Sequence, residues 1–234
     1  MNLFLDVADN FKHIIAPSLV AIYAPHDSRS GLIFQTGTGY LVRHNDRPVV
    51  ITALHTLYGE NGTDDPAEKS FFWHGKLHRV GNPPRDVYKV ADFDIAAFYA
   101  DELAAKPQLD PRWLAMPRHP IPYISLGGYL ARDFKRSGAG LNPAPRTHTD
   151  KRVASTKGLG FVSVRYTRRR NLDTFTGQRI QAAPRPKGLS GCPMIDSLSL
   201  LDGQPRIIGM FTDLVNGEAF GPSSHVTQAI LASM

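Results

Sequence analysis

The chain has 234 residues and a formal net charge of +6, and 42% of its residues are hydrophobic and 21% charged. This composition is typical of a folded globular protein and excludes a largely disordered chain. The length allows one compact domain or two small barrels that share an interface. The 20 glycines and 18 prolines favour a turn-rich β protein over a helical bundle. The one cysteine, Cys192, excludes an intrachain disulfide framework and favours a reducing compartment.

The N-terminal segment does not have the pattern of a signal peptide. Residues 1–10 contain no basic residue, and Asp6 and Asp9 interrupt their apolar positions. No segment approaches the roughly 18 uninterrupted apolar residues that a membrane-spanning helix needs. We therefore expect a soluble, cytoplasmic protein with no membrane partner.

The positive charge raises the question of nucleic-acid binding. Lysine and arginine cluster within residues 132–136, 151–152 and 165–170. Sites for single-stranded nucleic acid combine such charges with stacking aromatic residues, and only Phe134 and Tyr166 lie near these clusters in sequence. We interpret the clusters as solvated loops and strand faces that can steer an acidic partner. A basic nucleic-acid-binding β protein stays an alternative that rests on charge alone.

The first half of the chain predicts a short helix followed by strands. Residues 3–15 have apolar positions at helical spacing, and Pro17 ends the pattern. Residues 34–42 and 48–52 predict two antiparallel strands joined by a polar turn at 44–47. Further strand candidates in this half are residues 18–23, 71–74, 87–90 and 94–99.

The second half begins with a connector and continues with short strands. Residues 101–122 are rich in proline and do not alternate between apolar and polar positions, so they predict a link between two halves. Ser223 or Ser224 is placed to cap a short helix over residues 226–232. The strand candidates here are residues 123–130, 160–165, 174–181, 193–195, 206–212 and 217–220. Many short strands with frequent turns predict a closed or sandwich-like all-β architecture.

One serine has the surroundings of a nucleophile. Ser190 lies between Gly188 and Gly191, and Pro193 leads into the following strand. Small residues allow a tight backbone turn and the close approach of a substrate carbonyl. Such a serine is also common in ordinary turns. It becomes a nucleophile only when a histidine takes its proton, a carboxylate orients that histidine and N–H groups bind the oxyanion.

A histidine and an aspartate elsewhere in the chain complete this set. His55 follows the apolar run of residues 49–52, where a strand would deliver it to a rigid site, and Asp94 opens the apolar segment 95–99. A carboxylate at the lip of a buried strand is costly unless it is paired. Asp92 competes for the same role, because residues two apart on a strand share a face. The order histidine, aspartate, serine is one of the three known orders for a catalytic triad.

These segments together resemble the trypsin-like serine peptidases of the chymotrypsin fold, especially their disulfide-free bacterial members. The match covers residues 31 to about 225, and its order along the chain makes coincidence a poor explanation. The segments that carry it are Thr36–Val42 with its Gly-x-Gly-aromatic pattern, Thr52–His55, Asp94–Ala96, Gly188–Pro193 and, more loosely, Ile207–Thr212. The Asp-Ile-Ala match favours Asp94 over Asp92.

The resemblance implies a fold of two packed six-stranded antiparallel β-barrels with short N- and C-terminal helices. Residues 1–17 would form the N-terminal helix, and residues 18–110 a first barrel that carries His55 and Asp94. Residues 111–234 would form the second barrel, with Ser190, and the C-terminal helix.

The resemblance also implies a serine endopeptidase that hydrolyses protein or peptide substrates through an acyl-enzyme. Ser190 would be the nucleophile, His55 the general base and then acid, and Asp94 the group that orients the imidazole. The N–H groups of Gly188 and Ser190 would form the oxyanion hole. This chemistry needs no cofactor and no metal. A regulatory protein partner is an expectation for a cytoplasmic peptidase.

The specificity pocket would be walled by Pro184 and Arg185 on one side and by Thr212, Asp213 and Leu214 on the other. Arg185 would attract an acidic substrate side chain and Asp213 a basic one, so the sequence leaves specificity open.

The residue before the nucleophile departs from the digestive members of the family. Those enzymes have an aspartate there that pairs with a newly cut N-terminus, whereas this chain has Leu189. Leucine makes no ion pair, so we expect no activation by N-terminal cleavage and an apolar anchor for this loop.

Other residues and functions compete with this interpretation. Cys192 suggests a cysteine peptidase, but its place two residues after Ser190 favours packing. His74 and His78 have metal-ligand spacing without a third ligand near them. A catalytically silent binding module with the same fold is the main alternative function, although none of the three triad positions is degenerate.

Overall fold

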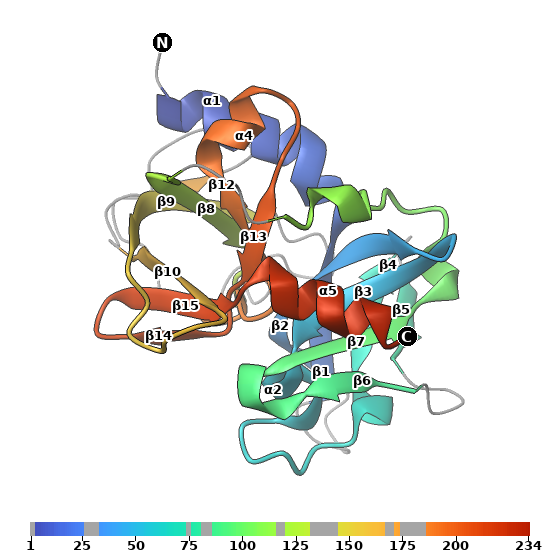
Figure 1. Cartoon of the computed structure of the whole chain (residues 1–234). Helices are drawn as coiled ribbons and strands as arrows, with labels where there is room; N and C mark the ends of the chain where they lie inside the picture. The colour runs from blue at the N-terminus through green and yellow to red at the C-terminus, as the bar shows by residue number, and fades with distance from the viewer. Residues whose placement is uncertain are drawn as a thin grey trace.

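The computed structural model describes residues 3–25, 33–73, 76–80, 86–115, 120–131, 145–166, 171–173 and 186–234. Two antiparallel β-sheets form the body of the molecule (Figure 1). The first sheet has the strand order β5-β4-β1-β2-β3-β7-β6. Its strands are β1 (Leu19–Pro25), β2 (Ile33–His44), β3 (Arg47–Ala53), β4 (Ser70–Trp73), β5 (Lys76–Arg79), β6 (Tyr88–Val90) and β7 (Ile95–Tyr99).

The second sheet has the order β13-β12-β8-β9-β10-β15-β14, and β11 pairs with β9 beside this path. A bridge between Gly209 on β13, at one end of the order, and Ser223 just after β15, next to the other end, shows that this sheet curls onto itself. Its strands are β8 (Tyr123–Gly128), β9 (Arg146–Val153), β10 (Phe161–Arg165), β11 (Asn171–Asp173), β12 (Pro193–Asp196), β13 (Ile207–Met210), β14 (Asp213–Val215) and β15 (Glu218–Pro222).

Short helices connect and cover the sheets. The N-terminal helix α1 packs against α4, and α5 contacts strands of both sheets. No helix in the described part of the chain is long and apolar enough to cross a membrane. The α-helices are α1 (Leu3–Asn10), α2 (Leu54–Tyr58), α4 (Ser197–Leu201) and α5 (Ser224–Ala232); η1 (Phe11–Ile15) is a π-helical turn, and the 3₁₀ turns are η2 (Ala16–Ser18), η3 (Pro66–Glu68), η4 (Ala91–Phe93), η5 (Asp101–Leu103) and η6 (Pro111–Trp113).

The fold class expected from the sequence is confirmed, but the number of strands differs. Each unit was expected to have six strands, and the sheets have seven and eight. Three strands, β6, β11 and β14, have three residues each and lie at the margins of the sheets. Such short segments give almost no periodic signal in a sequence. The strand predicted over residues 174–181 lies outside the described residues.

The hairpin between β2 and β3 follows the predicted turn chemistry. Asn45 and Asp46 both have positive φ angles, 49° and 58°. Asparagine and aspartate tolerate this left-handed region, which two-residue hairpins of type I′ require. The hairpin fixes β3 beside β2, and the end of β3 delivers the segment that contains His55.

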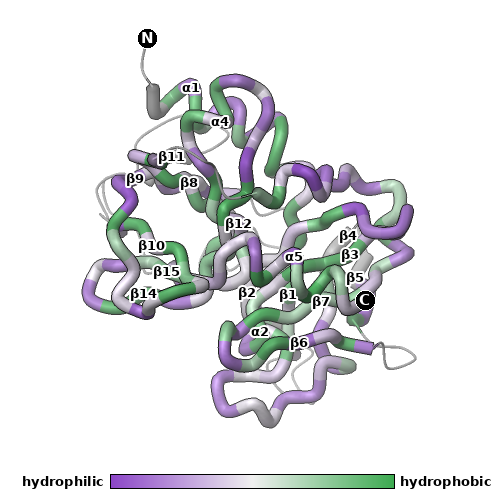
Figure 2. Tube along the Cα trace, viewed as in Figure 1, coloured by the Kyte–Doolittle hydropathy of each residue, from purple (hydrophilic) through white to green (hydrophobic). Residues whose placement is uncertain are grey.

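Three hydrophobic clusters organise the interior. One lies within the first sheet and one within the second, and Figure 2 shows hydrophobic stretches along the strands and hydrophilic stretches in the loops. The third cluster contains residues of both sheets, such as Ile51 and Met210, together with Phe11 of η1 and Ile230 of α5. This shared cluster holds the two sheets against each other.

Phe11 provides a test of the shared cluster. The ring is fully buried and lies so close to β8 that a Cβ atom at Gly127 would be 2.5 Å from it. We expect Phe11→Ala to lower the free energy of unfolding by about 3–5 kcal/mol, because it leaves a cavity between the sheets. Leu5 is 41% exposed on the adjoining helix, so Leu5→Ala should cost about 0.5 kcal/mol. Urea denaturation measures both, and equal losses would contradict this role of Phe11.

Candidate active site

His55 lies on the short helix that begins where β3 ends. Ala53 is extended, with φ −71° and ψ 140°, and the chain turns into α2 at Leu54. The Thr56 hydroxyl donates to the Ala53 carbonyl at 2.7 Å and supports the first turn of this helix. A strand followed at once by one helical turn gives His55 a rigid base at the end of β3, an interior strand of the first sheet.

Asp94 is joined to this turn by three hydrogen bonds. Its Oδ1 accepts from the His55 backbone N–H at 2.9 Å, its Oδ2 lies 2.6 Å from His55 Nδ1, and its carbonyl accepts from the Leu54 N–H at 3.0 Å. Asp94 adopts the left-handed conformation, with φ 50° and ψ 45°, between η4 and β7. That conformation is unfavourable for most residues, and the hydrogen bonds to α2 offset its cost.

The structure brings Asp94, and not Asp92, to His55. Asp92 is exposed and belongs to the 3₁₀ turn η4. The expectation that the two aspartates share the face of one strand was therefore wrong, because the strand β7 begins only at Ile95.

Opposing influences act on the His55 imidazole, whose side chain is 30% exposed. Burial lowers its pKa, but the hydrogen bond to Asp94 and the Asp94 charge raise it, and the charges of Glu60 and Asp213 add to this. The net result is a pKa of His55 above its ordinary value. With a hydrogen on Nδ1 bonded to Asp94, Nε2 is the basic nitrogen of the neutral ring.

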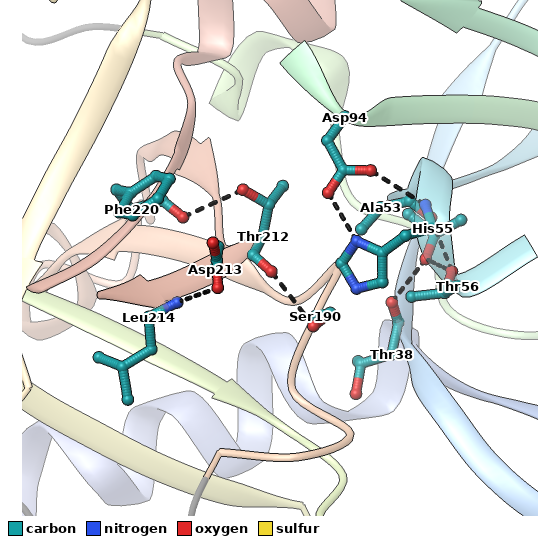
Figure 3. Close-up of polar contacts among 11 residues, drawn as sticks. Thr38, Ala53, His55, Thr56, Asp94, Ser190, Thr212, Asp213, Leu214 and Phe220 are labelled. Carbon is teal, nitrogen blue, oxygen red and sulfur yellow. Dashed lines mark hydrogen bonds and ion pairs between the residues drawn. The ribbon is translucent and has the colours of Figure 1, made fainter. Parts of the chain in front are cut away.

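Ser190 lies on the other side of this imidazole. In Figure 3 one ring nitrogen of His55 is directed toward Asp94 and the other toward Ser190. The Ser190 carbonyl accepts from the Thr38 N–H at 2.8 Å, and its hydroxyl donates to the Thr212 carbonyl at 3.2 Å. Among the described residues no hydrogen bond joins Ser190 Oγ to His55. Catalytic hydrogen bonds are often loose in unliganded sites.

Two N–H groups in the loop that contains Ser190 have no hydrogen-bond partner among the described residues. The Lys187 carbonyl accepts from Ala131 N–H at 3.0 Å, and the Leu189 carbonyl accepts from Cys192 N–H at 2.8 Å. In a trans peptide the N–H points opposite to the carbonyl, so the N–H groups of Gly188 and Ser190 point away from these partners. Within the described part of the chain neither of them donates a hydrogen bond. Gly188 has φ +96°, which favours glycine.

Leu189 anchors this loop by burial. Its side chain is 2% exposed and belongs to the hydrophobic cluster of the second sheet. The apolar anchor expected from the sequence is therefore present.

The remaining predicted pocket residues are only partly placed. Thr212 is buried, Leu214 is half-buried against the second cluster, and Asp213 is exposed. Pro184 and Arg185 lie outside the described residues, as do the basic residues of 132–136 and 168–170.

The rival residues have ordinary surroundings where they are described. Cys192 is fully buried, and burial raises the pKa of its thiol. His78 stacks on Phe71 with ring centroids 5.5 Å apart, whereas His74 lies outside the described residues. No group of three or more His, Cys, Asp or Glu side chains in the described ranges has the arrangement of a metal site.

Sequence reasoning missed two polar residues of β2 that contact the Ser190 loop. Thr38 is the middle residue of the Gly-x-Gly motif, and Gln35 precedes that motif. Both side chains donate to the Gly188 carbonyl. The signal that could have identified Thr38 is its polar side chain within a motif that is otherwise expected to be buried.

No protein-family model matches the chain, and no curated protein matches it. Several solved structures are similar to the chain. The thermostable serine protease AL20 from an extremophilic microorganism has a TM-score of 0.58 at 12% identity, covering 93% of this chain and 97% of that one. The serine protease of human pathogenic astrovirus gives 0.51 at 13%, covering 90% and 91%. The serine endoprotease of Yersinia pestis gives 0.56 at 13%, covering 100% of this chain and 66% of that one.

The chain has the chymotrypsin fold of the serine proteases. This confirms the fold that the sequence motifs implied. Identities of 12–13% establish fold and not activity.

The His55–Asp94 contact of this chymotrypsin fold leads to a test by titration. We expect NMR titration of the His55 ring to give a pKa above 6.5. Asp94→Asn should lower it, because the hydrogen bond and charge that raise the pKa are weakened while burial stays. Glu60→Gln, which removes only a nearby charge, should lower it less. A His55 pKa that does not change in Asp94→Asn would contradict the coupling.

Proposed function

We propose that the chain is a serine endopeptidase that hydrolyses protein substrates with His55, Asp94 and Ser190 as its triad. The observation that carries the proposal is the double contact of Asp94 with His55, at 2.9 and 2.6 Å, on the side of the imidazole away from Ser190. A carboxylate bonded to both the backbone and the ring fixes the tautomer and the orientation of the base.

The reaction assigns one task to each group. His55 Nε2 takes the proton of the Ser190 hydroxyl as Oγ attacks the substrate carbonyl carbon. The negative oxygen that forms is bound by the N–H groups of Gly188 and Ser190. The peptide C–N bond then breaks, and the imidazolium gives its proton to the leaving amine. Water, activated by the same nitrogen, hydrolyses the acyl-enzyme and restores Ser190.

The Ser190 hydroxyl must first leave the Thr212 carbonyl. Their hydrogen bond is long, 3.2 Å, and a typical neutral hydrogen bond contributes about 0.5–1.5 kcal/mol net. Rotation about the Cα–Cβ bond moves Oγ between staggered positions. The cost of reaching the productive rotamer is therefore small compared with the barrier that a triad lowers.

The edge of the second sheet supports binding of an extended peptide. β14 ends the strand order, so its outer edge has no partner among the described strands. It begins at Asp213, directly after the Thr212 carbonyl that accepts from Ser190. An extended segment can add to such an edge through backbone hydrogen bonds, which would bring its carbonyl group to Ser190. A protein or peptide substrate fits this edge better than a small molecule does.

The setting of the enzyme belongs to the same proposal. A cytoplasmic location and a regulatory protein partner follow from the cysteine count and from the need to restrain a peptidase among other proteins.

A fluorophosphonate probe tests the nucleophile. We expect the folded protein to be labelled at Ser190, because the reagent captures a serine activated by a neighbouring base. Ser190→Ala should abolish the labelling, and Cys192→Ala should retain it, which excludes the thiol two residues away. Mass spectrometry of the labelled peptide gives the site. A folded wild-type protein that stays unlabelled would favour a catalytically silent binding module.

Cleavage-site profiling then tests endopeptidase activity. Peptides from a whole proteome are incubated with wild-type protein or with Ser190→Ala, and new N-termini are identified. We expect internal cleavage sites that require Ser190. Labelling without any Ser190-dependent cleavage would show a reactive serine that does not hydrolyse peptides.

A further inference from the structure

The carbonyl of Gly188 is held by two side chains from the other sheet. Thr38 Oγ1 donates to it at 2.7 Å and Gln35 Nε2 at 3.1 Å. Both residues lie on β2 of the first sheet and are buried, with exposures of 0% and 1%. The candidate oxyanion loop is thus bonded to a strand that is about 150 residues away in sequence.

Three successive peptide groups lead from Lys187 to Ser190, and the middle one joins Gly188 to Leu189. The outer two carbonyls, of Lys187 and Leu189, accept from N–H groups of the second sheet's own segments. The middle carbonyl, of Gly188, accepts only from side chains of β2 in the described structure. The orientation of this carbonyl fixes the conformation of the backbone between the N–H groups of Gly188 and Ser190, which we assign to the oxyanion hole. The Leu189 N–H of the same peptide group donates to the Pro186 carbonyl at 2.9 Å, so loss of the β2 bonds would leave the middle peptide held at its N–H alone.

Every polar group of Thr38, its hydroxyl, N–H and carbonyl, takes part in a hydrogen bond. Its hydroxyl donates to Gly188 and accepts from the Tyr129 N–H at 3.0 Å, and its own N–H donates to the Ser190 carbonyl at 2.8 Å. Its carbonyl accepts from the Thr52 hydroxyl at 2.8 Å. A hydroxyl has one hydrogen to donate. Because the Tyr129 N–H is itself a donor to Thr38 Oγ1, the hydroxyl hydrogen goes to the Gly188 carbonyl. The contact therefore has one hydrogen-bond arrangement.

The approach of β2 to the nucleophile also explains the first glycine of the motif. A Cβ atom at Gly37 would clash with the Thr56 side chain and lie 2.8 Å from the Ser190 carbonyl oxygen. Only glycine lets β2 come this close, and the close approach puts the Thr38 hydroxyl within reach of Gly188.

Gln35 shows the cost of this arrangement. Its Nε2 faces three carbonyls, of Gly37, Tyr129 and Gly188, while its Oε1 is buried with no partner among the described residues. A buried acceptor without a partner is destabilising. An apolar side chain of similar shape would avoid that penalty, but it would also leave the Tyr129 carbonyl without the donor that it has at 2.8 Å.

We propose that Thr38 and Gln35 are positioning residues that hold the Gly188 carbonyl, and so keep the oxyanion loop in its catalytic shape. The proposal rests on the function proposed above. Two uncharged side chains of the first sheet would support the oxyanion loop, which Leu189 cannot support through an ion pair.

Variants of these residues separate positioning from folding. Thr38→Val removes the hydroxyl and keeps the shape, Thr38→Ser restores it, and Gln35→Met removes the second donor. The matched control is Thr149→Val, which deletes a buried hydroxyl that bonds Ser125 at 2.7 Å on the strands near α4. Urea denaturation establishes that each variant is folded; Gln35→Met removes the unpartnered Oε1 but also leaves the Tyr129 carbonyl without this donor.

The first readout is the second-order rate of labelling of Ser190 by a fluorophosphonate, whose phosphoryl oxygen enters the oxyanion hole. We expect Thr38→Val to lower this rate roughly 10- to 100-fold, less than the roughly 10²- to 10³-fold loss for deleting an oxyanion donor itself. Gln35→Met should lower it by a smaller factor. Thr38→Ser should stay near the wild-type rate, and Thr149→Val should not change it. Equal rates in Thr38→Val and wild type would overturn the proposal.

The second readout does not require activity. Amide hydrogen exchange reports the bonds from Leu189 N–H to Pro186 and from Cys192 N–H to Leu189. We expect both amides to exchange faster in Thr38→Val and in Gln35→Met, and not in Thr149→Val. If Thr38→Val does not fold, Gln35→Met gives the same comparison. Unchanged exchange in the folded variants would overturn the role in holding the loop, whereas an unlabelled wild type with faster exchange in the variants would contradict only the endopeptidase function.

Discussion

The candidate active site depends on the contact between the two sheets, because each sheet carries only part of it. His55 and Asp94 lie next to strands β3 and β7 of the first sheet, and Ser190 lies in the loop before β12 of the second. The shared hydrophobic cluster, with residues such as Ile51 and Met210, keeps the sheets together. Displacing a catalytic group by about 1 Å can cost about 100-fold in rate. The core between the sheets therefore determines the geometry of the chemistry as well as the stability of the fold.

Apolar packing alone does not define that geometry. Hydrophobic attraction is nondirectional and roughly proportional to the buried area, whereas a hydrogen bond requires its donor and acceptor in a narrow range of distances and angles. The contacts of Thr38 with Ser190 and Gly188 supply this directional part at the candidate nucleophile. The cluster brings the sheets together, and these bonds select one relative position.

The sequence predicted the triad candidates because their signals are local. A histidine after a buried strand, an aspartate before one and a serine between glycines are each visible within a few residues. The partners of Thr38 could not be found in this way, since they follow it by about 90 and 150 residues and contact it only in the folded chain. The 3₁₀ turn at Asp92 was missed for a related reason. Asp94 leaves that turn in a left-handed conformation that its contacts with α2 support; aspartate tolerates this conformation but does not require it, so the sequence alone does not indicate it.

The chain as a whole is positive, yet His55 lies in a locally negative field. Asp94, Glu60 and Asp213 all raise its pKa, against the effect of burial. Because the folded-state pKa exceeds the value of about 6.5 expected in the unfolded chain, protonation of His55 stabilises the fold. This contribution is fully present below about pH 6.5 and is lost as the pH rises through the folded-state pKa. The proposed reaction needs the neutral imidazole, which forms in the same window. The stability contributed by this pair and the proposed activity therefore change in opposite directions with pH. In the proposed triad the carboxylate that orients the imidazole also disfavours its neutral form, and the burial of the ring acts against that effect.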